Sequence, residues 1–110
     1  MPTTYKVLGQ VAPSATTATT LDTVPSATQV VVSTITVCNR AATAATFRIA
    51  VRPAGAALAN EHYVAYDSTV GANDIVALTI GITLAATDVI TVYASTANLS
   101  FNAFGSEITA

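Results

Sequence analysis

Residues 29–53 read QVVVSTITVCNRAATAATFRIAVRP, a segment crowded with Val, Ile, Thr and Phe. Branched and flat side chains of this kind favour extended strands, and the small residues at 39–45 favour a turn between two strands. In the second half, side chains alternate with the period of two of a half-buried strand. Phe47, Ile49 and Val51 share one face, and Thr46, Arg48, Ala50 and Arg52 share the other. We therefore predict a long antiparallel hairpin whose second arm buries one face.

The first arm of this hairpin has a less regular pattern. Val30 and Val32 are expected to point one way, and Val31, Ile35 and Val37 the other. A strand that is apolar on both sides is typical of the middle of a sheet. We predict a central strand that is covered on both faces over its first half.

Outside the hairpin, short apolar runs separated by turn-forming residues recur about every ten residues, a spacing typical of sandwiches and barrels. Residues 53–60 are expected to cross from one sheet to the other. Residues 12–20, APSATTATT, lack large apolar side chains and are predicted to form a loop or an extended arm across a neighbour. The further predicted strands are 4–11, 21–24, 61–66, 75–82, 89–95 and 99–108, with 75–82 and 89–95 central. The fold prediction is a single all-β domain over 1–110, an antiparallel, jelly-roll-like β-sandwich of about eight strands.

Composition bounds the classes of partner. Charged residues are 9% of the 110 residues, against about a quarter in typical domains. A chain this poor in charge either carries a Thr, Ser and Ala coat or covers its surface with other subunits, and we favour a homo-oligomer or larger assembly. A net charge of −2 with four basic residues argues against nucleic acid. No apolar run reaches the roughly 18–20 residues of a membrane helix, and no signal peptide is evident, so we expect neither a membrane partner nor secretion.

The inventory of chemically active side chains is small. Cys38 and His62 are the sole residues of their types, and no nucleophile elbow, phosphate loop or zinc motif occurs. We expect Cys38 to be a small buried side chain, and His62 to face away from its neighbour Glu61. Asp67 and Asp74 fall in predicted turns, where they either satisfy backbone amides or form a loose calcium site. We predict no enzymatic activity, no cofactor and no resident metal.

Two sets of side chains are candidates for an interface. Arg48 and Arg52 lie on one face of a strand, about 13 Å apart, and Arg40 lies in the adjoining turn. They favour either a docking face for carboxylates of another subunit or a solvated sheet face. The tyrosines are interpreted as core or interface packing, or alternatively as an aromatic platform for sugars. They are Tyr63, Tyr66 and Tyr93, of which Tyr63 and Tyr66 join the three arginines as interface candidates.

Most of the chain after Leu21 resembles small structural proteins of tailed bacteriophages, cyanophages among them. The matching runs are VVVSTITVCNRAATAATFRIAVRPAG (30–55) and YVAYDSTVGANDIVALTIGITLAATDVITVYASTANLSFNAFGSEIT (63–109). The elements shared with such proteins are a valine-proline pair before these runs, an apolar strand ending in Cys-Asn and an Ala/Thr-rich turn. They are followed by Tyr-Asp, Ala-Asn-Asp, Gly-Ile, Asp-Val-Ile and Ala-Ser-Thr, and by a closing GSEIT. The positions are Val24, Pro25, Cys38, Asn39, Tyr66, Asp67, 72–74, Gly81, Ile82, 88–90, 94–96 and 105–109.

The resemblance implies a virion component assembled in the host cytoplasm. The leading hypothesis is a non-enzymatic capsid decoration or cement protein that contacts copies of itself and other virion proteins such as the major capsid protein. Scarce charge and a flexible N-terminal segment suit that role, because an arm that orders on a neighbour adds contact area. The alternative is a tail, neck or fibre-associated structural module that recognises a receptor or glycan.

Overall fold

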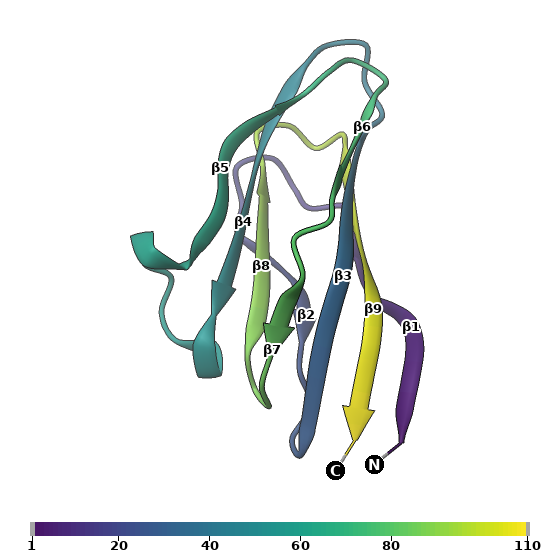
Figure 1. Cartoon of the computed structure of the whole chain (residues 1–110). Helices are drawn as coiled ribbons and strands as arrows, with labels where there is room; N and C mark the ends of the chain where they lie inside the picture. Colours follow the sequence, from purple (N-terminus) through teal and green to yellow (C-terminus); the bar gives the residue numbers. More distant parts are fainter. Residues whose placement is uncertain (1, 110) are drawn as a thin grey trace.

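A computed structural model describes residues 2–109 and contains nine strands and two short 3-10 turns (Figure 1). None of the helical segments within residues 2–109 has the length and hydropathy of a transmembrane helix. The strands are β1 (Thr3–Val11), β2 (Thr19–Thr23), β3 (Thr28–Asn39), β4 (Ala45–Arg52), β5 (Tyr63–Val70), β6 (Ile75–Leu78), β7 (Ile82–Leu84), β8 (Val89–Ala94) and β9 (Leu99–Thr109), and the 3-10 turns are η1 (Pro53–Gly55) and η2 (Asn60–His62).

The strands form two antiparallel sheets packed face to face (Figure 1). One sheet has the order β1-β9-β3-β6, with β7 also paired to β3, and the other has the order β2-β8-β4-β5. Because β6 and β7 follow one another along the same side of β3, they occupy one strand position that is interrupted. Eight strand positions in this order make a jelly roll. The prediction of an antiparallel, jelly-roll-like sandwich is confirmed.

The predicted hairpin is wrong, because its two arms belong to different sheets. β3 pairs with β9, β6 and β7, whereas β4 pairs with β5 and β8. The chain crosses between the sheets after Asn39, whose buried amide donates to the carbonyls of Thr43 at 2.8 Å and Gly71 at 3.2 Å and accepts from Ala41 N–H at 3.0 Å. Two alternating strands with a short connection look alike in sequence whether they pair or change sheets.

A β-bulge in β3 corrects the prediction that both of its faces are covered. The pairing of β3 with β9 shifts between Val32 and Thr34, so Ser33 is an extra residue. An extra residue exchanges the two faces of a strand from that point on. Val30 before the bulge and Ile35 after it therefore both point into the core, and both are fully buried. Val31 stays on the outer face and is partly exposed.

Two further connections differ from the prediction. Residues 53–62 do not change sheet but join β4 to its neighbour β5. The predicted strand 75–82 is an interrupted edge rather than a central strand, because β6 and β7 pair with β3 and flank a break at 79–81. Gly81 has a φ of +61° at this break, a conformation that ends regular pairing. The predicted turn at 67–74 is shorter, since β5 continues to Val70 through a positive φ at Asp67.

The core lies between the two sheets. The rings of Phe47 on β4 and Phe101 on β9 meet edge to face, with centroids 6.2 Å apart. Aliphatic side chains from both sheets surround them, and Cys38 is partly buried at the end of β3. The fully buried aliphatic residues include Val24, Val30, Val32, Ile35, Val37, Ile49, Val70, Ile90, Val92 and Leu99.

The N-terminal loop and the two ends of the described chain have defined positions. Residues 12–18 form a loop against β8, where Thr16 N–H donates to the Ala94 carbonyl at 2.8 Å, and Thr19 already belongs to β2. The start of β1 and the end of β9 lie at the same corner of the sandwich (Figure 1). There Thr109 N–H donates to the Pro2 carbonyl at 3.0 Å.

Candidate functional site

The outer face of the β2-β8-β4-β5 sheet carries most of the predicted interface residues. β4 buries Phe47 and Ile49 against the core, so Arg48, Ala50 and Arg52 point outward, as the sequence pattern predicts. Strand register then sets their neighbours on this face. Arg48 lies opposite Tyr93 of β8, and Ala50 lies between Thr91 of β8 and Tyr63 of β5.

Arg48 is the centre of an aromatic and ionic cluster. Its guanidinium carbon lies 4.2 Å from the ring centroid of Tyr66 and 4.3 Å from that of Tyr93. Its Nε donates to Asp67 Oδ1 at 2.7 Å, and its Nη2 donates to Oδ2 at 3.4 Å. The hydrogen bond to Asp67 raises the pKa of Arg48 above its ordinary value. Tyr63 completes the cluster with its ring edge to face against Tyr66, at a centroid distance of 4.9 Å.

This arrangement bears on the docking hypothesis. A carboxylate of another subunit would have to displace Asp67 in order to bind Arg48 bidentately. Arg40 lies away from the cluster, in the crossing after β3, and donates through Nη2 to the Ala97 carbonyl at 3.0 Å. Arg52 ends β4, and its buried Nε has no hydrogen-bond partner in residues 2–109. The structure thus brings together Arg48, Tyr63 and Tyr66, but not Arg40.

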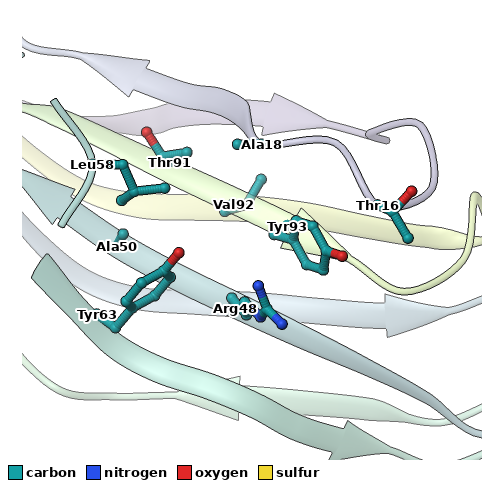
Figure 2. A pocket seen from close by; sticks show the side chains of 9 residues that line it. All are labelled: Thr16, Ala18, Arg48, Ala50, Leu58, Tyr63, Thr91, Val92 and Tyr93. Atoms are coloured by element: carbon teal, nitrogen blue, oxygen red, sulfur yellow. The ribbon is translucent and has the colours of Figure 1, made fainter. Parts of the chain in front are cut away.

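A pocket of about 260 Å³ opens beside the cluster (Figure 2). Its floor is formed by the sheet, and two loops wall it, residues 12–18 on one side and 56–62 on the other. Figure 2 shows Leu58 next to Thr91 at one end, and Arg48 next to Tyr93 at the other. The pocket is lined by Thr16, Ala18, Arg48, Ala50, Leu58, Tyr63, Thr91, Val92 and Tyr93.

Two floor residues of this pocket are buried although they point away from the core. Ala50 is 1% exposed and Thr91 is 6% exposed. The Thr91 hydroxyl is closed off from solvent and has no hydrogen-bond partner within residues 2–109. Buried hydroxyls are normally paired, because an unpaired one costs free energy. The floor of the pocket therefore holds a polar group whose hydrogen-bonding capacity is not used within residues 2–109.

The remaining polar candidates serve local structure. His62 Nδ1 accepts from Ala59 N–H at 3.1 Å and closes the 3-10 turn. Asp74 accepts from Ile75 N–H at 2.8 Å, and both oxygens of Asp67 bind Arg48. Within the part of the chain that the structure describes, no three His, Cys, Asp or Glu side chains are grouped as a metal site would need. The calcium alternative therefore gains no geometric support.

Sequence reasoning missed a second surface, on the outer face of the β1-β9-β3-β6 sheet. Tyr5, Val7, Val31 and Phe104, which we name the apolar patch, are 86%, 47%, 36% and 37% exposed. Register places Val7 opposite Phe104, and places Ser106 between Tyr5 and Val31. A shallow hollow of about 370 Å³ is lined by Tyr5, Val31 and Phe104 of this patch. The alternation along β1 places Tyr5 and Val7 on one face, but it does not indicate that this face is exposed to solvent.

Comparison with known proteins does not assign the chain to a family. No protein-family model matches the sequence. A search of curated proteins finds no significant match either.

Proposed function

We propose that the chain is a non-enzymatic structural protein of a bacteriophage particle, and that it acts as a capsid decoration or cement protein. Its partners in this role are further copies of itself and the major capsid protein. The apolar patch is the observation that carries the proposal. The resemblance to phage structural proteins is the reason for proposing a phage particle as the assembly that the chain joins.

The apolar patch has the character of a contact surface. Large apolar side chains that stand together in solvent, rather than singly, are typical of sites that another protein covers. Tyr5 is 86% exposed, although it lies within a regular strand. Tyrosine in particular is enriched at the centre of interfaces, because it combines a large apolar area with one polar group. Covering this patch would bury apolar surface that the isolated domain leaves in water.

β1 adds a second means of association. It pairs with β9 on one side, and no strand of residues 2–109 lies on its other side (Figure 1). An edge strand presents unpaired N–H and C=O groups that can pair with a strand of another chain. The first five residues of β1 are exposed. Lys6 is the one charged residue of this strand, and its ion pair with Glu107 is exposed and contributes little to stability.

Fold and composition agree with this role. Jelly-roll sandwiches serve in viral capsid and lectin domains, although fold alone does not establish function. With 9% charged residues, the chain has few groups that would oppose close contact with other subunits.

The test uses heads of the parent phage from which this protein has been removed. Purified chain is expected to rebind to saturation, and the Tyr5→Ser/Val7→Ser variant is expected to bind at least about tenfold more weakly, because apolar contact area is lost. Val64→Ser is the matched control, since Val64 is 49% exposed but lies on β5 of the other sheet.

Equal binding of the double variant and the control would remove the apolar patch from the interface. Absence of the protein from every purified particle would overturn the proposed function itself. Because all the substituted side chains are exposed, the variants are expected to fold, and a circular dichroism spectrum of β type checks this.

A further inference from the structure

We propose that the pocket between the 12–18 and 56–62 loops binds one neutral sugar ring of the hexopyranose class. This inference goes beyond attachment to a particle, and it concerns the sheet opposite the apolar patch. It rests on the shape of the pocket, the side chains that line it, and the unpaired hydroxyl of Thr91.

The pocket is a built feature rather than a gap between surface side chains. Ala50 supplies a small floor between two longer residues of β4, Arg48 and Arg52. One wall is held in place by the hydrogen bond from Thr16 N–H to the Ala94 carbonyl at 2.8 Å. The other is held by the 3-10 turn that His62 closes through Ala59 N–H. Walls fixed in this way lower the ordering cost of binding.

The size and chemistry of the pocket fit a single sugar ring. Its volume of about 260 Å³ is below the roughly 300–1,000 Å³ of pockets for drug-sized ligands, so it suits one ring. Tyr63 and Tyr93 offer aromatic surface, and the C–H groups on one face of a pyranose pack favourably against the electron-rich face of such rings. Threonine and tyrosine hydroxyls among the lining residues can both donate to and accept from sugar hydroxyls.

The charge of the pocket favours a neutral ligand. Arg48 is the one charged residue in the lining, and its guanidinium is engaged by both oxygens of Asp67. An anionic sugar would therefore meet a cation that is already neutralised. A neutral ring needs only the hydrogen bonds and apolar contacts described above.

Thr91 gives the ligand a specific polar partner. Its hydroxyl is buried and has no hydrogen-bond partner among residues 2–109, and Leu58 lines the same end of the pocket (Figure 2). The Leu58 side chain is 39% exposed, so it can change rotamer and move aside while the backbone of the wall stays in place. We expect a sugar hydroxyl to reach Thr91 as Leu58 is displaced, and the orphan group then gains its missing hydrogen bond.

The experiment is a titration of the isotope-labelled full chain, followed by amide NMR shifts. The probes are methyl α-D-glucopyranoside, methyl α-D-mannopyranoside and methyl β-D-galactopyranoside. At least one is expected to give saturable shifts at Ala18, Ala50 and Leu58, with a dissociation constant on the order of 1–10 mM, as suits a ligand of about a dozen heavy atoms. No saturable shift with any of the three up to about 100 mM would overturn the proposal.

Two variants and one control locate the binding site. Ala50→Leu fills the floor and is expected to weaken binding at least about tenfold, whereas Thr46→Leu, on the same strand and outside the pocket, leaves it unchanged. Thr91→Val keeps the shape of the side chain but removes its hydroxyl, and it is expected to weaken binding about fivefold. This second variant tests the site even if Ala50→Leu does not fold. Shifts that survive both substitutions overturn the site.

The charge of the ligand is tested separately. Methyl β-D-glucuronide is expected to bind no more tightly than the neutral glycosides. Binding at least about tenfold tighter would overturn the assignment of a neutral ligand.

Discussion

On the outer face of the β2-β8-β4-β5 sheet, Tyr66 and Tyr93 pack on Arg48, and two loops wall the pocket beside them. On the outer face of the other sheet, Tyr5 is 86% exposed and Phe104 is 37% exposed. Both sheets bury equivalent inner faces in one core. The difference shows that the fold requires only the inner faces, and that each outer face is free to take a separate role.

The largest effect is expected from Gly105→Ala, which attacks the sheet that bears the apolar patch. An added Cβ at Gly105 would overlap the carbonyl oxygen of Val31, beside the bulge at Ser33. The backbone of β3 or β9 must then shift, and we expect a loss of about 3 kcal/mol in the free energy of unfolding, measured by urea denaturation.

Gly81→Ala is the matched control for this substitution. Within residues 2–109, no atom beyond the adjoining residues lies within 4 Å of an added Cβ at Gly81, although its φ is +61°. Backbone strain alone should cost about 1 kcal/mol. Equal losses for the two glycines would contradict the close approach at Gly105.

The next effect is expected at Asn39, which joins the two sheets. It ends β3, and its amide donates to the carbonyl of Thr43, and to Val70 and Gly71 at the end of β5. Asn39→Ala leaves several buried backbone groups without partners, and we expect a loss of about 2–3 kcal/mol in thermal or urea unfolding. A loss below about 0.5 kcal/mol would mean that water replaces the amide.

A smaller effect, of opposite sign, is expected at Thr91. Replacing the unpaired buried hydroxyl by a methyl group in Thr91→Val should raise the free energy of unfolding by about 1 kcal/mol. The same substitution at a buried threonine whose hydroxyl is hydrogen-bonded would lower the free energy of unfolding. If calorimetry shows Thr91→Val to be less stable than the original chain, the hydroxyl has a partner in solution.

The smallest effect is expected at Asp22 and depends on pH. Burial, and secondarily the charge of Glu107, raise the pKa of Asp22 above its ordinary value of 3.8. The folded chain therefore binds more protons than the unfolded chain in the interval just above pH 3.8, and stability falls as pH rises through it.

Asp22→Asn removes this dependence. Its melting temperature should exceed that of the original chain at pH 7 and match it near pH 3, because the carboxyl group is then protonated in both states. Glu61→Gln, in the exposed 3-10 turn, is the control. A melting temperature raised equally at both pH values would show that the carboxylate is not the cause.

Sequence patterns predicted the fold class well and the strand partners poorly. Alternation in 46–52 correctly separates the core residues Phe47 and Ile49 from the outward Arg48. Alternation cannot say which strand lies alongside, so the sheet change after Asn39 was missed. The bulge at Ser33 was missed for a related reason, because the period of two assumes an unbroken register.

The candidate site was predictable where strands supply it and not where loops do. Arg48, Tyr63 and Tyr66 were named as interface candidates, and they meet on the outer face of one sheet. Asp67 was assigned to a turn, although β5 continues through it with a positive φ. Aspartate adopts positive φ values in turns as well, so its sequence does not distinguish the two cases. Thr16 and Leu58 reach the pocket from loops whose course depends on tertiary contacts, and their sequences give no indication of it.

The hydrogen bond between Thr109 and Pro2 has a practical consequence for engineering. Since both ends of the described chain meet at one corner, a short peptide could join them and close the backbone into a ring without moving any strand. New ends could then be opened in the exposed residues 56–58. A circular permutant of this kind would display a fused tag above the pocket, while the original chain displays it beside β1.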